Sequence, residues 1–298
     1  MRLGLAAAAC LAAPRRLFAK SSADFDENMA VFLADIHAGA GKRCGAARKM
    51  FAVTVAEILK MDPLPRNVLV FGDVAHMCGL AADYGISRQH FNLLEDAGIT
   101  VTIGMGNHDR RSEFAKRWPE AAAKSLVPGL YVHLAETPNV DFLMLDTLAG
   151  ADGRPPADEG PQGGVLPENE QAFLRSFLSV RGKPAIVCAH HPSSDLWCCG
   201  SRLDALLRAS PRAAGYVHGH FHRWRLESGR EICLPSAASW GDVGYAICRC
   251  RPDRAEIGCV LKGFSLPAPA GNPLMLPARP AERAATFAFE QPPGRRAG

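Results

Sequence analysis

Short runs of apolar residues recur along the chain, and each run ends at polar side chains. The runs have the length of strands and are rich in valine, isoleucine and phenylalanine, so each predicts a β-strand. They occupy residues 29–34, 67–71, 98–104, 184–189 and 215–217.

Between the first two runs, apolar residues recur with a helical period. Phe51, Val55, Ile58 and Leu59 stand at positions i, i+4, i+7 and i+8, the apolar stripe of an amphipathic helix. Two further helices are predicted at residues 168–180 and 201–210. Strands that alternate with helices favour an α/β fold, in which ligand sites gather beyond the carboxyl ends of the strands.

The remaining segments divide the chain into three parts. These are residues 1–27, an N-terminal segment that is flexible or similar to an export signal, residues 28–262, the domain itself, and residues 263–298, a Pro-rich C-terminal extension. Within the domain, residues 150–167 are rich in glycine and proline and predict a long surface loop. Residues 244–261 predict a hairpin that turns at Pro252-Asp253.

The N-terminal segment bears on localisation. Residues 3–14, LGLAAAACLAAP, form an apolar run with the length of a signal peptide, too short to cross a bilayer. Only Arg2 precedes the run, and Arg15-Arg16 follow it, which departs from the usual order of charges. The run favours export to the periplasm or the extracellular space, and the alternative is a weakly ordered N-terminus of a cytoplasmic protein. No other segment has about eighteen uninterrupted apolar residues, so we expect no integral membrane association.

Composition and charge are those of an ordinary globular protein. Of 298 residues, 48% are hydrophobic and 21% are charged. The net charge of +4 is small and the basic residues are dispersed, so we expect no nucleic-acid partner, whereas an anionic substrate is compatible. The ten cysteines lack paired C-x-x-C spacing, which argues against a zinc ribbon. We expect most of them to be buried, with about one or two disulfides if the protein is exported.

The polar residues at the strand ends are of types that bind metals. In chain order they are Asp35, His37, Asp73, Asn107, His108, Asp109, His190, His220 and His222. Each alone has a simpler explanation, since an aspartate after a strand often caps a turn and a single histidine is often a hydrogen-bonded core residue. His218, His220 and His222 alternate, so a strand would place them on one face, as a metal site or as a His-rich surface strand.

Taken together, these residues form five motifs in a fixed order. The motifs are D-x-H at 35–37, G-D at 72–73, G-N-H-D at 106–109, H-x-P at 190–192 and G-H-x-H at 219–222. With this series, residues 28–262 resemble the calcineurin-like metallophosphoesterases. The resemblance implies an α/β fold of four layers, an α/β/β/α sandwich of two mixed sheets flanked by helices, with a two-metal site at the sheet edge.

The resemblance also implies the ligands of two divalent cations. Asp35, His37 and His222 would bind the first ion, Asn107, His190 and His220 the second, and Asp73 would bridge them. Imidazole, carboxylate and amide donors suit Mn, Fe or Zn, and a ligand set without cysteine disfavours a structural zinc. A bridging carboxylate lets two dications lie roughly 3.5–4 Å apart, the arrangement used in phosphoryl chemistry.

The implied activity is hydrolysis of phosphoric esters by a hydroxide that the two metals activate. His108 would protonate the departing oxygen or stabilise its charge. Asp109 would either orient His108 or cap the turn. His191 and His218 are not ligands in the family pattern; we expect His218 to be a hydrogen-bonded neighbour, and His191 to contact the ligands or to be exposed.

Two residues differ from the motifs of related groups of the family and argue against membership of those groups. Met105 stands where serine/threonine protein phosphatases carry an arginine, and His76 where purple acid phosphatases carry a tyrosine. The chain is most similar to class III cyclic-nucleotide phosphodiesterases and glycerophosphodiesterases, which share a Pro-Ser segment like Pro235-Ser236. The implied substrate is a small phosphodiester or phosphomonoester. The alternatives are a non-catalytic metal-binding scaffold on the same fold and a nuclease.

Overall fold

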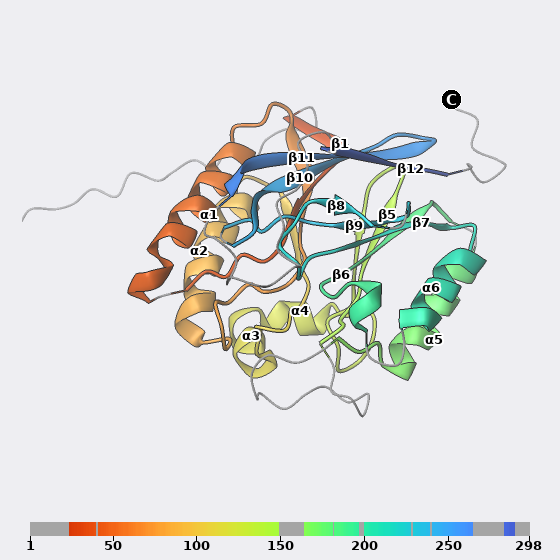
Figure 1. The fold of residues 1–298 in the computed structure, drawn as a ribbon, viewed down its shortest axis with the longest axis horizontal. Coiled ribbons are helices and arrows are strands. Elements are labelled where there is room, and N and C mark those ends of the chain that lie inside the picture. Colours follow the sequence, from red (N-terminus) through yellow and green to blue (C-terminus); the bar gives the residue numbers. More distant parts are fainter. Residues whose placement is uncertain are drawn as a thin grey trace, which may run out of the picture.

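The residues that the structure describes form two six-stranded β-sheets that pack face to face (Figure 1). A computed structural model describes residues 24–39, 41–148, 164–180, 182–196, 200–227, 229–238, 240–264 and 283–289. The first sheet has the strand order β12-β11-β10-β1-β2-β3. Its parallel strands are β1 (Phe25–Leu33), β2 (Leu64–Val70) and β3 (Thr100–Ile103). Its antiparallel strands are β10 (Asp242–Cys250), β11 (Arg254–Phe264) and β12 (Ala284–Ala288).

The second sheet has the strand order β4-β5-β6-β7-β9-β8. Its four inner strands run parallel and are β5 (Asp141–Met144), β6 (Ala185–Ala189), β7 (Ala213–His218) and β9 (Glu231–Cys233). Its two edge strands run antiparallel to their neighbours and are β4 (His133–Glu136) and β8 (Arg225–Leu226). Both sheets are therefore mixed, as the resemblance implies.

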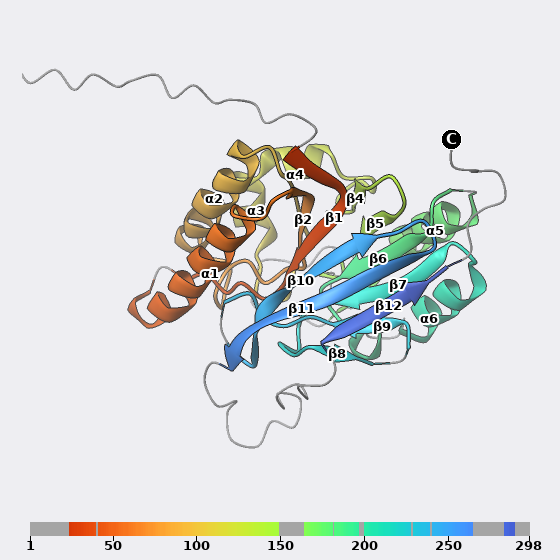
Figure 2. The ribbon, with the colours of Figure 1, turned by 90° about the horizontal axis from the view of Figure 1, so that it is seen from above.

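Helices cover the outer faces of both sheets. Figures 1 and 2 show α1 (Gly45–Ile58) and α2 (Ala81–Asp96) on one side of the sandwich, and α5 (Glu168–Ser179) and α6 (Gly200–Ala209) on the other. The shorter helical segments are η2 (Lys42–Cys44), α3 (Arg111–Arg117), α4 (Pro119–Ala123) and η3 (Ser193–Asp195). The predicted four-layer α/β/β/α sandwich is confirmed.

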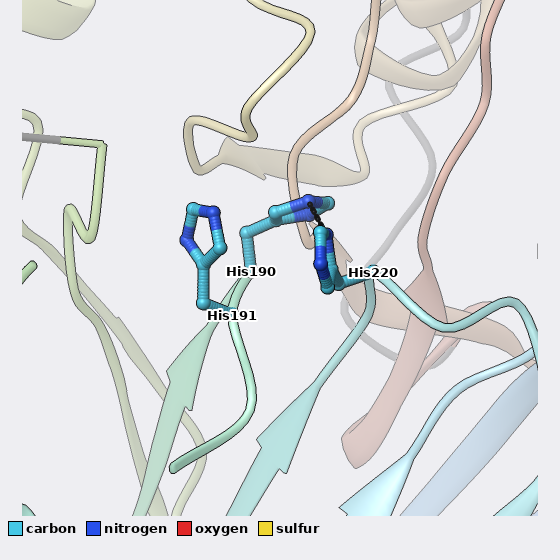
Figure 3. A group of neighbouring side chains, drawn as sticks. All are labelled: His190, His191 and His220. Atoms are coloured by element: carbon cyan, nitrogen blue, oxygen red, sulfur yellow. Dashed lines mark hydrogen bonds between the residues drawn. The ribbon is translucent and has the colours of Figure 1, made fainter. Parts of the chain in front are cut away.

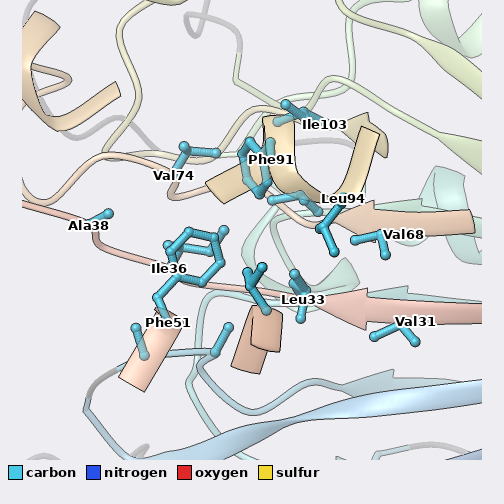
Figure 4. Close-up of a cluster of buried hydrophobic side chains, with 14 of the residues drawn as sticks. Val31, Leu33, Ile36, Ala38, Phe51, Val68, Val74, Phe91, Leu94 and Ile103 are labelled. Atoms are coloured by element: carbon cyan, nitrogen blue, oxygen red, sulfur yellow. The ribbon is translucent and has the colours of Figure 1, made fainter. Parts of the chain in front are cut away.

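The alternation of side chains along β1 explains these layers. Val31 and Leu33 face the helices, where they join a core with Phe51 of α1 and Phe91 of α2 (Figure 4). The intervening Phe32 faces the other sheet. Its ring meets the rings of Phe71 and Phe142 edge to face, with centroids 5.3 and 5.5 Å away. The second half of β1, residues 29–33, is buried on both faces and so has no polar face, which is why it forms a continuous apolar run.

The predicted elements agree with the structure. The five predicted strands lie in β1, β2, β3, β6 and β7, the three helices correspond to α1, α5 and α6, and the hairpin is the β10–β11 pair. Within the predicted C-terminal extension, Ala284–Ala288 form β12 and pair with β11, so this part of the extension completes the first sheet. Residues 1–23 and 149–163, which hold most of the predicted N-terminal segment and surface loop, lie outside the described residues.

The described cysteines are free thiols. Five of them are buried, as expected from the sequence: Cys44, Cys188, Cys233, Cys248 and Cys250. Cys10, Cys198 and Cys199 lie outside the described residues. None of the helices in the described part of the chain is long and apolar enough to cross a membrane.

A buried ionic cluster ties α3 and α5 to the end of β5. The Arg111 guanidinium donates to both carboxylate oxygens of Asp146 at 2.6 and 2.8 Å, and the Asp146 backbone N–H donates to Glu170 Oε1 at 2.7 Å. Glu170 is fully buried, and its second oxygen has no hydrogen-bond partner among the described residues. Burial and the negative charge of Asp146 raise the pKa of Glu170 well above its ordinary value, although Arg111 opposes the shift.

This raised pKa predicts that stability falls with rising pH. The folded chain holds a proton on Glu170 that the unfolded chain releases, so the stabilisation is present below the ordinary glutamate pKa and is lost as pH rises through the raised value. Glu170→Gln, which mimics the protonated form, is expected to remove this part of the pH dependence. Urea unfolding of both proteins between about pH 5 and about pH 9 measures the difference. Parallel curves for the two proteins would contradict the prediction.

Candidate metal centre

The sequence places every predicted ligand just after a strand, and the fold brings those strand ends together. Asp35 and His37 follow β1, Asp73 follows β2, Asn107 follows β3, His190 follows β6, and His220 and His222 follow β7. The parallel strands of each sheet end at the same edge, so seven ligands from distant parts of the chain meet there. The first sheet supplies four of them and the second sheet three.

The ligand loops turn sharply as they leave the strands. Five of the predicted ligands have positive φ values although none is glycine: Asp35 (52°), His37 (46°), Asp73 (50°), His220 (71°) and His222 (51°). Such backbone costs about 1–3 kcal/mol at each residue, and it clusters at sites where geometry is imposed by function. Gly219 is required by a close approach, since a Cβ there would lie 2.7 Å from Asp35 Oδ2.

The first group of ligands consists of Asp35, His37, Asp73 and His222, all of them buried. The Nε2 atoms of His37 and His222 are 3.2 Å apart. Asp35 Oδ1 lies 3.3 Å from His222 Nε2, and Asp73 Oδ2 lies 3.5 Å from His37 Nε2. Four donor atoms thus converge on one point, as predicted for the first metal.

The second group lies beside the first. Asn107 Oδ1 lies 2.9 Å from His190 Nε2 and 3.1 Å from His220 Nδ1, and these two ring nitrogens are 3.2 Å apart (Figure 3). Asp73 Oδ2 lies 3.4 Å from His190 Nε2, so the same oxygen that approaches His37 in the first group also approaches the second. The structure therefore brings together all seven predicted ligands, with Asp73 between the two groups.

Backbone carbonyls fix the ring orientation of two ligand histidines. His37 Nδ1 lies 2.9 Å from the carbonyl oxygen of His76, and His190 Nδ1 lies 2.8 Å from that of Phe71. A carbonyl can only accept, so each Nδ1 carries the hydrogen and each Nε2 presents its lone pair to the centre. Burial lowers the pKa of His37 to about 3 and also lowers the pKa of His190, which keeps both rings neutral.

The carboxylates at the centre are held in the ionised form. Burial alone would raise the pKa of Asp35 and of Asp73, but neighbouring histidines lower both values overall. Imidazole nitrogens, of which Nε2 of His37 and of His190 present their lone pairs to the centre, fit divalent cations of the Mn, Fe or Zn type together with ionised carboxylates and an amide oxygen. The donor set of this chain therefore agrees with the ions that the sequence implies.

His108 lies at the edge of the centre. Its backbone N–H donates to Asp73 Oδ1 at 2.8 Å, and its side-chain Nε2 lies 4.0 Å from Asp73 Oδ2. Its Nδ1 donates to the carbonyl oxygen of Met77 at 3.1 Å, which directs Nε2 toward the ligands. The side chain is 18% exposed, so His108 faces both the centre and solvent.

Asp109 has the second of its two expected roles, that of a turn cap. Its carboxylate accepts hydrogen bonds from the backbone N–H groups of Val74, Ala75 and Gly106 and from the hydroxyl of Tyr84. These contacts fasten the loop after β2 to the G-N-H-D turn, whereas the side chain of His108 is oriented by Met77. The first expectation, that Asp109 orients His108, is not what the structure shows. Burial and the charge of Asp73 raise the pKa of Asp109 to about 7.

Two further histidines near the centre, His191 and His218, are buried. His218 Nδ1 donates to the carbonyl oxygen of Gly219 at 2.8 Å, so His218 is a hydrogen-bonded neighbour, as expected. His191 contacts Thr147 Oγ1 through Nδ1 at 2.8 Å, and its ring lies 4.9 and 5.1 Å from the rings of His190 and His220. Of the two expectations for His191, contact with the ligands is confirmed and exposure is wrong.

Three contacts at the centre were not predicted from the sequence. Trp240, which has a φ of 67°, stacks on His222 with an interplanar angle of 17° and lies 4.7 Å from the ring of His37. Ser236 Oγ donates to the carbonyl oxygen of Asp35 at 2.7 Å, and Asp195 Oδ2 lies 3.1 Å from His220 Nε2. Ser236 could have been found, because it belongs to the Pro-Ser segment. Trp240 and Asp195 belong to no motif, so nothing in the sequence indicates that they contact the centre.

Comparison with known proteins identifies the family of this chain. The calcineurin-like phosphoesterase family model matches residues 30–224, and the chain belongs to this family. The chain is 31% identical, over 191 residues, to a probable cyclic nucleotide phosphodiesterase of Rhodopseudomonas palustris. The aligned region covers 58% of this chain and 62% of that relative, so the chain spans less than two thirds of the relative's length.

Solved structures share the fold at low sequence identity. A dimetal phosphatase from Danio rerio superposes with a TM-score of 0.63 at 12% identity, covering 88% of this chain and 99% of that chain. The protein TT1561 of Thermus thermophilus superposes with a TM-score of 0.51 at 11% identity, covering 78% and 98% of the two chains. At these identities the comparison supports the architecture alone.

Proposed function

We propose that this chain is a dinuclear metal-dependent hydrolase of small phosphoric esters. The observation that carries the proposal is the position of Asp73 Oδ2, which lies 3.5 Å from His37 Nε2 in one ligand group and 3.4 Å from His190 Nε2 in the other. A single carboxylate that lies between two groups of imidazoles is an arrangement that suits a pair of dications. The complete ligand set, together with His108, favours catalysis over a non-catalytic scaffold.

The side chains divide between two ion positions. Asp35, His37 and His222 would hold the first ion, Asn107, His190 and His220 the second, and Asp73 both. Two divalent ions held in this way supply Lewis-acid activation of water and charge stabilisation of the phosphoryl oxygens. The protein fixes the donors in advance, through the carbonyls of His76 and Phe71 behind two of the rings.

His108 is the residue placed to assist the departing oxygen. Because its Nδ1 donates to Met77, Nε2 is the atom left to carry a second proton and donate it to a leaving group at the centre. An alkoxide leaves poorly unless it is protonated, so this role matters most for esters of aliphatic alcohols. The relative from Rhodopseudomonas palustris, named as a probable cyclic nucleotide phosphodiesterase, supports phosphodiesters as the substrate class.

Metal-dependent turnover tests the proposal. We expect the metal-stripped protein to be inactive and Mn²⁺ to restore hydrolysis of bis(p-nitrophenyl) phosphate. The monoester p-nitrophenyl phosphate is tested as the alternative substrate. Titration of the stripped protein should reach two ions per chain. An Asp35→Asn variant purified in the same way controls for contaminating phosphatases. Absence of Mn²⁺-dependent turnover on both esters, or saturation below two ions, would refute the proposal.

A further inference from the structure

His220 differs from His37 and His190 in the group that contacts the ring nitrogen facing away from the centre. Its Nδ1 faces the second group, 3.1 Å from Asn107 Oδ1, while its opposite nitrogen, Nε2, lies 3.1 Å from Asp195 Oδ2. His37 and His190 are instead held by backbone carbonyls. A carboxylate fixes the tautomer and the ring orientation of a ligand histidine and also makes the ring a stronger donor to a metal.

The segment that carries Asp195 is anchored to the sheet. Asp195 ends the short helix η3, and Ser193 begins it. The backbone N–H and the hydroxyl of Ser193 donate to the two carboxylate oxygens of Glu231, at 2.9 and 2.8 Å. Glu231 is buried at the start of β9, so η3 is attached to an inner strand of the sheet rather than to another loop.

The same pair of strands positions both partners. β9 pairs with β7 through Tyr216↔Glu231 and His218↔Cys233, and the chain leaves β7 directly into His220. Asp195 is thus held relative to β9 and His220 relative to β7. The contact between them therefore rests on two neighbouring, hydrogen-bonded strands, and it does not require any exposed loop to be rigid by itself.

We propose that Asp195 is a positioning residue that fixes the ring of His220 and increases the affinity of the second group for a divalent cation. The inference rests on the proposed function, in that it takes the second group to hold an ion. Asp195 touches neither substrate nor reacting atoms in this role; it acts through His220 alone.

Titration of the metal-free protein with Mn²⁺ tests the inference. Asp195→Ala is expected to weaken one of the two binding steps about 10- to 100-fold and to leave the other step unchanged. His220→Ala should abolish the same step. Asp195→Asn should lose less affinity, because its amide oxygen still accepts the hydrogen bond while the charge is gone. At saturating Mn²⁺, kcat of Asp195→Ala should return to the wild-type value, since the chemistry does not use Asp195.

A matched control is Asp204→Asn. The Asp204 side chain is 38% exposed, similar to the 41% of Asp195, and it pairs with Arg208 on α6. This variant should bind both ions as the wild type does. Two unchanged steps in Asp195→Ala, or an equal loss in Asp204→Asn, would overturn the inference while the proposed function stands. A wild-type protein that takes up fewer than two ions would instead refute the proposed function itself.

Discussion

Asp73→Asn is expected to lower kcat/KM for bis(p-nitrophenyl) phosphate by about 10³-fold or more. Asparagine keeps the size of the side chain and can still accept from the backbone N–H of His108, as Asp73 Oδ1 does at 2.8 Å. It removes the single negative charge that lies between the two ligand groups. Without that charge, two dications would repel each other across a neutral bridge in a buried site.

The measurement combines steady-state rates with metal analysis of the same preparation. The bound Mn²⁺ should fall from two ions to one or fewer in Asp73→Asn, while the thermal unfolding of the metal-free protein changes little. Asp204→Asn, an exposed Asp→Asn change on α6, is the matched control and should keep both rate and metal content. A variant that retains two ions and wild-type kcat/KM would show that Asp73 does not bridge.

His108→Ala is expected to lower kcat about 10²- to 10⁴-fold for an alkyl phosphodiester. The loss should be much smaller for bis(p-nitrophenyl) phosphate, because p-nitrophenolate leaves without a proton. Metal uptake should not change, since the side-chain Nε2 of His108 lies 4.0 Å from Asp73 and outside both ligand groups. The leaving-group dependence thus separates a proton donor from a residue that only supports the fold.

The comparison needs both esters and a control histidine. His90, on α2, hydrogen-bonds to the carbonyl oxygen of Ile86 and belongs to neither ligand group, so His90→Ala should hydrolyse both esters at the wild-type rate. Equal losses on the two esters in His108→Ala, or a loss of bound Mn²⁺, would contradict the acid role. In that case the side chain of His108 would act by supporting the loop through its bond to the carbonyl oxygen of Met77, since alanine keeps the backbone N–H that donates to Asp73.

The strand ends could be predicted because two physical signals coincide there. A strand segment buried on both faces, such as residues 29–33 of β1, gives a continuous apolar run, and the polar residues that follow it mark its end. The long helix α2 was not predicted. Its buried positions include Asp83 and Ser87 as well as Phe91 and Leu94, so polar residues interrupt the apolar stripe that would have indicated it.

The ligand set could be predicted, whereas its surroundings could not. The ligands belong to motifs with fixed spacing, but the groups behind them are mostly backbone, such as the carbonyls of Phe71 and His76. Every residue has a carbonyl, so no residue type marks the one that contacts a ring. The role of Asp109 depends on which groups hydrogen-bond to its carboxylate. Only the structure shows that these groups are backbone amides and the hydroxyl of Tyr84.

The division of the ligands between the two sheets has a consequence for how the centre is made during translation. Each ligand group combines residues from both sheets: Asn107 with His190 and His220, and Asp35 with His222. A nascent chain that has only emerged through β3 can hold neither group complete. The proposed function therefore implies that a complete site for either ion forms only after residue 222 has left the ribosome and the second sheet has docked.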